Sequence, residues 1–175
     1  KGADLTNANL TDVNLKGADL NGIILQSVDL SGKDLTGTAL KGADLTNANL
    51  TDANIQYSNL IGANLTGANL ENVMLYRANL TGANLTGANL ENVTLYRTNL
   101  TGADLTNANL TDANTQYSNL TGANLTGANL ENVMLYRANL TGADLTNANL
   151  TGANLENVIL TDTILNCVGH RICTS

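Results

Sequence analysis

The sequence contains no phenylalanine, tryptophan or proline, and its aromatic residues are five tyrosines among 175 residues. Large aromatic side chains normally fill much of a globular core of this size. Their absence therefore disfavours an ordinary globular domain. The apolar residues are mainly leucine and alanine, a composition that suits a thin core of uniform cross-section.

Cysteines and long apolar runs are also scarce. The two cysteines, Cys167 and Cys173, lie together near the C-terminus, so they provide no disulfide framework for the rest of the chain. No apolar run reaches the ~18–20 residues of a membrane helix, and we expect no membrane partner. A reducing cytoplasm is the default location. Because the sequence begins at Lys1 without methionine, an already cleaved export signal is an open alternative.

The residues that support most catalysis are few. The chain has one histidine, and it shows no serine–histidine–carboxylate set, no phosphate-binding glycine loop and no paired buried carboxylates. We therefore predict that the protein is not an enzyme and needs no cofactor. Fifteen acidic residues against eight basic ones give a net charge of −7, which argues against direct binding to nucleic acid.

A five-residue repeat organises nearly the whole chain. Leucine occupies 31 of the 33 positions divisible by five from 5 to 165, with Ile55 and Thr115 as the exceptions. A small or β-branched residue stands two positions before each of these leucines except Leu35, and Asn or Asp usually lies between. Successive leucines would be 140° apart on an α-helix and on opposite faces of a straight strand. The chain must therefore turn once per pentapeptide, and glycines two positions after the leucine mark the turn.

A longer period of twenty residues groups the pentapeptides. Glu-Asn-Val occurs at 71–73, 91–93 and 131–133, and Tyr-Arg occurs at 76–77, 96–97 and 136–137. Four pentapeptides then complete one coil of a parallel β-solenoid. We predict an all-β fold with about eight to nine coils over residues 1–165, followed by a C-terminal cap or tail at 166–175.

The repeated Ala-Asp-Leu-Thr-Asn and Ala-Asn-Leu-Thr-Gly units resemble those of the pentapeptide-repeat proteins, which are common in cyanobacteria. The resemblance covers about residues 1–165 and implies a right-handed quadrilateral β-helix. It also implies a non-catalytic structural or protein-binding scaffold with an unidentified protein partner. Some members resemble B-form DNA and inhibit DNA gyrase, so a DNA-mimicking inhibitor or protector of gyrase is the alternative. The modest acidity of this chain and its lack of an interrupting loop disfavour that alternative.

One set of surface residues is a candidate for binding a protein partner. Tyrosine and arginine are enriched in binding hot spots, and here they share one corner of the predicted solenoid. The alternative is that the stacked side chains only support one another along the rod. This tyrosine–arginine column consists of Tyr57, Tyr76, Arg77, Tyr96, Arg97, Tyr117, Tyr136 and Arg137.

The C-terminal residues form a second candidate region. Cys167, His170 and Cys173 suggest a metal site or a disulfide, but structural zinc needs four ligands, so a simple end cap is favoured. Continuing the five-residue phase places Cys167 at a corner and Cys173 inside. Together with apolar neighbours these residues would seal the last coil or form the contact of an end-to-end homodimer, the alternative being a monomer. The candidate residues are Ile159, Ile164, Cys167, Ile172 and Cys173.

Residues 21–40 break the pattern. Ile24 and Ala39 replace the usual Asn or Asp, and Lys33 occupies an inward position. Burying an ammonium group is costly, so we expect either a local distortion or a lysine whose amine reaches the surface.

Overall fold

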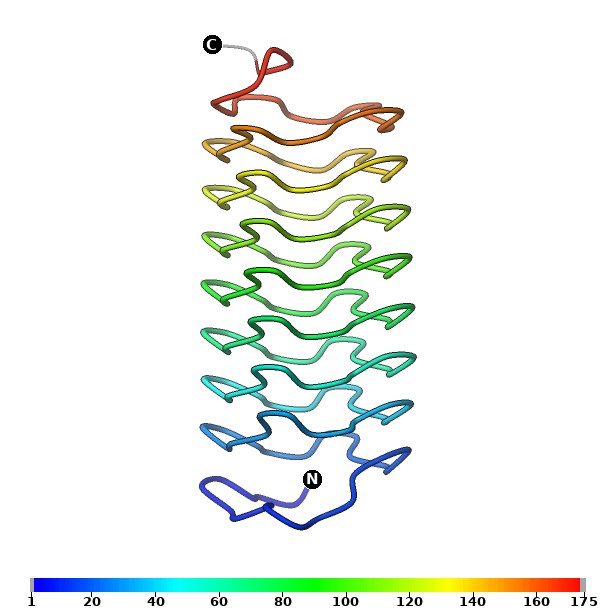
Figure 1. Cartoon of the computed structure of the whole chain (residues 1–175), viewed down its shortest axis with the longest axis vertical. Helices are drawn as coiled ribbons and strands as arrows, with labels where there is room; N and C mark the ends of the chain where they lie inside the picture. The colour runs from blue at the N-terminus through cyan, green and yellow to red at the C-terminus, as the bar shows by residue number, and fades with distance from the viewer. Residues whose placement is uncertain (1, 174–175) are drawn as a thin grey trace.

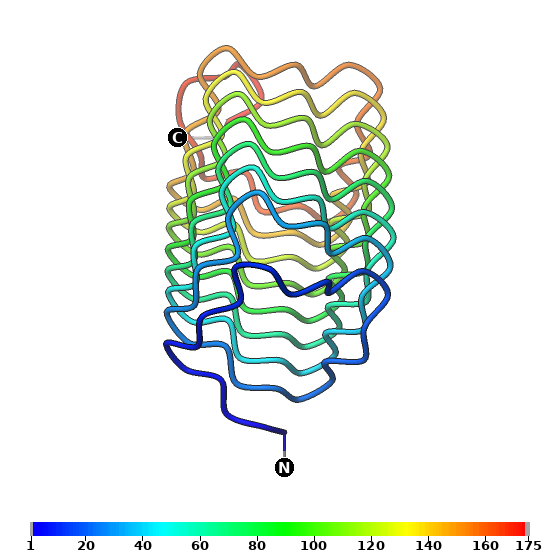
Figure 2. The ribbon, with the colours of Figure 1, turned by 60° about the horizontal axis from the view of Figure 1, so that its bottom comes forward.

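The chain winds into a right-handed β-helix, a stack of similar coils along one axis, with the N-terminus at one end and the C-terminus at the other (Figure 1). The computed structural model describes residues 2–173. In an oblique view with the N-terminal end forward, successive coils after the first repeat nearly the same outline (Figure 2). The uniform outline follows from the uniform repeat, since each coil contributes the same residue types at the same places.

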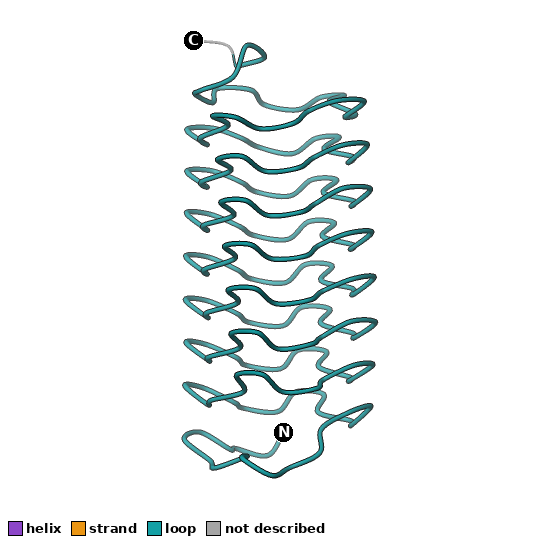
Figure 3. Ribbon diagram, in the orientation of Figure 1, coloured by secondary structure: helices purple, strands orange, loops and turns teal. Residues whose placement is uncertain are grey.

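Pairing between coils is parallel and joins residues twenty positions apart, from Asp4 with Ile24 through to Asn139 with Ile159 and Asp144 with Ile164. Each contact is an isolated bridge, and within residues 2–173 no α-helix and no extended strand is formed (Figure 3). The reason is the five-residue period: a turn follows every bridge, so no paired segment grows longer.

The core consists of the leucines and the small residues two positions before them. Leu85 and Ala83 are fully buried, as are their counterparts in most coils. The prediction that these two positions point inward is confirmed. In the regularly stacked coils the leucine amide also donates to the next coil, as Leu85 N does to Asp104 O at 2.7 Å, so burying the backbone there leaves its polar groups paired.

Two-residue turns separate the bridges. In these turns the carbonyl of the leucine, or of Ile55 or Thr115 in its place, accepts the amide three residues on, as Leu120 does from Ala123 at 3.0 Å. The second turn residue has a positive φ, for example 64° at Gly122, which is the pattern of a type II turn. Glycine recurs at this position because it adopts positive φ without steric cost, as the sequence predicted.

The outward Asn and Asp side chains form a series of hydrogen bonds along the rod, which the composition alone did not indicate. Asn119 Oδ1 accepts the amide of Thr121 at 3.1 Å and its hydroxyl at 2.6 Å. Asn119 Nδ2 in turn donates to Thr101 Oγ1 in the preceding coil at 3.0 Å. The pattern Asn-Leu-Thr thus fixes each turn and links neighbouring coils.

The first coil departs from this regularity at the inward lysine. No bridge joins Asn9 to Asp29 or Asn14 to Asp34, although such pairs are present in the later coils of the described region. The Lys33 side chain instead reaches the carbonyl oxygen of Thr11, and a recess of about 330 Å³ opens there. The separation is visible at the bottom of Figure 1, in dark blue. The predicted local distortion is confirmed.

The five-residue phase ends after Leu165. Asn149 pairs with Val168, nineteen residues away instead of twenty, so the chain has lost one residue of register. Cys167 consequently takes an inward place and is only 6% exposed. The corner position expected for Cys167 was therefore wrong, because the phase does not continue through residues 166–168.

Candidate functional site

The five tyrosines lie in one column along the solenoid, one in each of five consecutive coils. Neighbouring rings are in contact throughout, with centroid separations of 5.4 to 5.8 Å. Tyr76 and Tyr96 are stacked, with 19° between their planes, and the other pairs meet edge to face. Both arrangements are favourable for aromatic pairs. The coil spacing of a parallel sheet, ~4.8 Å, brings the rings to this distance.

Arginine side chains cover the edge of the tyrosine column. Arg77 lies 5.2 Å from the Tyr76 ring centroid, while Arg97 and Arg137 both lie within 6 Å of Tyr117 as well as of their own neighbours. These are cation–π distances. Within residues 2–173 no carboxylate lies within 4.0 Å of these guanidinium groups, since the single ion pair there joins Lys16 to Asp34. The arginine charges are stacked on aromatic rings but not neutralised.

Several residues of the column have a strained, left-handed backbone conformation that the sequence did not reveal. Among the described residues, nearly all the left-handed turn positions hold Gly, Asn or Asp, with Ser27 as one exception. The column supplies the others, with φ between 54° and 60° in side chains that normally avoid this region. Strain retained at specific positions is a reason to look for a function there. The residues concerned are Tyr57, Arg77, Arg97, Tyr117 and Arg137.

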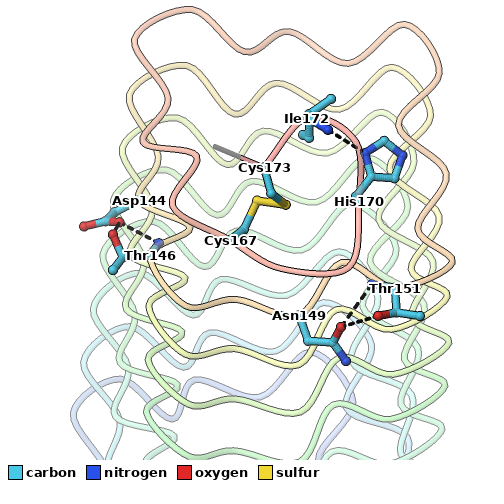
Figure 4. Close-up of a disulfide and its surroundings, with 8 residues drawn as sticks. All are labelled: Asp144, Thr146, Asn149, Thr151, Cys167, His170, Ile172 and Cys173. Atoms are coloured by element: carbon cyan, nitrogen blue, oxygen red, sulfur yellow. Dashed lines mark hydrogen bonds between the residues drawn. A yellow bond between two sulfur atoms is a disulfide. The ribbon is translucent and has the colours of Figure 1, made fainter. Parts of the chain in front are cut away.

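The C-terminal loop is closed by a disulfide between Cys167 and Cys173 (Figure 4). Of the three alternatives for these cysteines, the structure has the disulfide, which leaves neither thiol able to bind a metal. Ile172 and Cys173 contact the end of the core, whereas Ile159 and Ile164 are half-exposed at outward bridge positions. Those two isoleucines therefore do not cover the core, and their role in a contact between copies stays a prediction.

Other kinds of site have little support in the described part of the chain. Residues 2–173 contain no cluster of three or more His, Cys, Asp or Glu side chains placed to hold a metal ion. They also contain no helix of the length and hydropathy needed to cross a membrane. The tyrosine–arginine column is thus the strongest candidate surface.

Comparison with known proteins agrees with the repeat. The family model described as pentapeptide repeats matches eight copies, over residues 1–32, 34–72, 75–112, 103–142 and 138–167. No curated protein matches the sequence. Several solved structures are similar, among them QnrB1 and HetL. QnrB1, a plasmid-mediated fluoroquinolone resistance protein, is 20% identical, with 93% of this chain and 88% of that chain covered and a TM-score of 0.61.

HetL, a protein involved in heterocyst differentiation regulation in the cyanobacterium Nostoc, is 30% identical, with 97% of this chain and 91% of that chain covered and a TM-score of 0.36. The likeness to QnrB1 shows the fold alone. The family match, in contrast, extends over nearly all the coils, and its copies coincide with the repeats that build them. The chain belongs to the pentapeptide-repeat family.

Proposed function

We propose that this protein is a non-catalytic scaffold that binds another protein through its tyrosine–arginine column. The observation that carries the proposal is the left-handed backbone at five column residues, where glycine would be less strained. A merely structural ladder would not need tyrosine or arginine at such positions. The same corner in the flanking coils holds Gly37 and Asn157, residues that adopt positive φ readily.

The chemistry of the column fits protein recognition. Tyrosine buries a large rigid surface at a low entropic cost, and arginine offers five donors in a planar fork. The rings and guanidinium groups are already ordered by mutual stacking, which lowers the entropy lost on binding. A regular rod gives such groups fixed spacing along a partner, and within residues 2–173 leucine and alanine side chains fill the core.

The experiment is a pull-down from the native host with tagged wild type and with Tyr76→Ser/Tyr96→Ser/Tyr136→Ser. We expect the wild type to retain a specific protein that the triple variant loses. A matched control carries Thr66→Ser, Thr86→Ser and Thr126→Ser at a different corner and should retain it. Identical captured proteins for wild type and the tyrosine variant would overturn the proposal.

The alternative function is a DNA-mimicking inhibitor or protector of gyrase. A mimic needs a dense strip approaching the duplex value of one charge per ~1.7 Å. Fifteen acids distributed over all sides of the rod do not approach that density. A supercoiling assay with purified gyrase separates the two functions, since inhibition at sub-micromolar protein would favour the mimic and no effect at far higher concentration would remove it.

We also propose the number of sides and the number of coils of the solenoid. Pairing at twenty residues together with a turn every five supports a four-sided coil and about eight to nine coils over residues 1–165, with 166–175 as cap or tail.

The cellular location is also a proposal. A cytoplasmic protein was expected, but the Cys167–Cys173 disulfide supports the exported alternative, because disulfides persist in oxidising compartments. Trapping the thiols by rapid alkylation in host cells decides between them.

A further inference from the structure

A second column of charge runs beside the first. At the corner one pentapeptide before each tyrosine stands an acidic residue, and the sequence places these acids in the same five consecutive coils. Bridges between residues twenty apart bring equivalent corners of successive coils above one another. The acidic column consists of Asp52, Glu71, Glu91, Asp112 and Glu131.

The two columns match coil by coil. Where the second corner is Tyr-Arg the first corner carries Glu, and where it is Gln-Tyr the first corner carries Asp. The coils on either side have neither feature: Ser31-Gly32 and Thr36-Gly37 precede, and Thr151-Gly152 and Glu156-Asn157 follow. Over residues 21–160 an acid at the first corner and a tyrosine or arginine at the second are therefore present together and absent together, whereas in the end coil Asp12 is followed by Lys16-Gly17.

Between the columns lies an open face of the solenoid. Its outward residues form one parallel ladder, in which Asn54 pairs with Met74, Met74 with Thr94, Thr94 with Asn114 and Asn114 with Met134. Both methionines are more than a third exposed, at 39% and 37%. The face is thus a flat β-surface with an apolar contribution, bordered by an acidic edge and an aromatic–basic edge.

The charges on the two edges do not neutralise each other within one molecule. Among residues 2–173, neither the arginines of one edge nor the glutamates of the other take part in an ion pair. Asn72 donates to Asp52 at 3.1 Å, and Asn109 makes only a long contact of 3.5 Å with Glu91. Like charges repeat at the coil spacing of ~4.8 Å along the acidic column, and Arg77 and Arg97 lie in adjacent coils, so like charges repel one another within both columns. A partner with the complementary arrangement of charges would reduce the repulsion within both columns at once.

We propose that this partner is a second copy of the chain, docked side by side through the face between the two columns. The proposal rests on the proposed function, since it takes the tyrosine–arginine column to be a protein-binding surface. It identifies the protein bound there as a second copy of the chain. A two-fold axis parallel to the solenoid axis exchanges the left and right edges of the face and keeps every coil at its own height. The acidic column of each copy then meets the tyrosine–arginine column of the other.

The register follows without adjustment. Glu71 faces Arg77 of the partner's same coil, Glu91 faces Arg97 and Glu131 faces Arg137, with the reciprocal contacts made by symmetry. In the remaining two coils Asp52 and Asp112 face tyrosines, which can donate a phenolic hydrogen bond. An antiparallel arrangement is excluded by the same geometry, because an axis perpendicular to the rods would place acids against acids.

Sedimentation velocity on the intact chain tests the proposal, with two charge-reversed triples as probes. The first carries Arg77→Glu, Arg97→Glu and Arg137→Glu, and the second carries Glu71→Arg, Glu91→Arg and Glu131→Arg. We expect wild type to dimerise, each triple alone to lose at least about a hundredfold in association, and an equimolar mixture to form heterodimers. The mixture is restored because both edges are then complementary again. Added salt should weaken the wild-type dimer, since exposed pairs are screened.

Milder variants guard against a triple that fails to fold. Glu91→Arg or Arg97→Glu alone should weaken the dimer, and the double variant Glu91→Arg/Arg97→Glu should recover it, because the exchanged charges again face each other across the two-fold axis. A wild type that stays monomeric at every concentration, or triples that associate as wild type does, would overturn the inference. If wild type is monomeric but the pull-down still loses a protein with the tyrosine variant, this inference alone fails and the proposed function stands.

Discussion

The side-chain amine of Lys33 donates a hydrogen bond to the backbone carbonyl of Thr11, in the preceding coil. Lys33 occupies a position whose counterparts Ala53, Val73 and Val93 are completely buried. Its ammonium group therefore reaches out through the gap between the first two coils, where the bridges of Asn9 and Asn14 are missing. The inward lysine thus lies where the end coil is locally separated, while the later coils keep their bridges.

Lys33→Ala should close this gap. An inward alanine removes the cost of placing an ammonium group at the core, and we expect an increase of about 1 kcal/mol in the free energy of unfolding. Hydrogen exchange at the amides of Asp29 and Asp34 should slow, because the missing inter-coil bonds can form. Lys41→Ala, at an exposed corner, is the control. Unchanged exchange at both amides would show that Lys33 is not the cause of the separation.

Leu85→Asp should be severely destabilising. Leu85 is fully buried in the middle of the rod, and an unpaired carboxylate there should cost more than about 3 kcal/mol in chemical denaturation. Asn84→Asp, at the adjacent outward position, should change stability by less than about 0.5 kcal/mol. Equal midpoints for the two variants would contradict the inward orientation of the leucine phase.

Stability should fall at acidic pH, and Asp34 should contribute to the fall. Its pKa is lowered from 3.8 to about 2, first because its carboxylate accepts hydrogen bonds from the Thr36 hydroxyl and amide, and also because it pairs with Lys16. A pKa depressed in the folded state gives stability that is present above 3.8 and lost as the pH falls toward about 2. Thermal melts across this range should show a smaller decline for Asp34→Asn, which keeps an acceptor for Thr36. Parallel declines would contradict this contribution.

The left-handed corner should be measurable as strain. At Arg97, whose φ is 57°, the Gly variant should be about 1 kcal/mol more stable than the Ala variant. Both variants lose the contacts with Tyr96 and Tyr117, so their difference isolates the backbone term. The usual order, Ala more stable than Gly, is expected at Thr86, the first residue of its turn. Finding that order at Arg97 too would remove the strain argument.

The disulfide should stabilise the C-terminal end locally. Closing a loop of this length contributes about 2 kcal/mol in the chain-entropy model, and in a solenoid the effect stays near the end coil. Cys167→Ser/Cys173→Ser should therefore speed hydrogen exchange of the amides around Ile172 and leave the exchange of the amides around Leu85 unchanged. Protection around Ile172 equal to wild type would mean that packing alone holds the cap.

Much of the fold could be predicted from the sequence because one short-range constraint repeats. An odd period of five forces a turn after every leucine, as at Leu120, and recurrence at twenty residues, as at Tyr76 and Tyr96, sets the length of a coil. Lys33 could be recognised as irregular for the same reason, since any exception stands out against a uniform phase. These inferences needed only steric rules and the cost of burying charge.

Tertiary structure decided what depends on exact placement in space. The one-residue shift in register that buries Cys167 occurs where the repeat ends, so the five-residue pattern could not predict it. The positive φ of Arg97 depends on its turn being closed around that residue, and its approach to two tyrosine rings depends on the next coil. The sequence by itself determined which residues share a corner, because periodicity is a property of the chain. Distances, backbone strain and unpaired charge were decided only when the coils stacked, because those are relations between segments twenty residues apart.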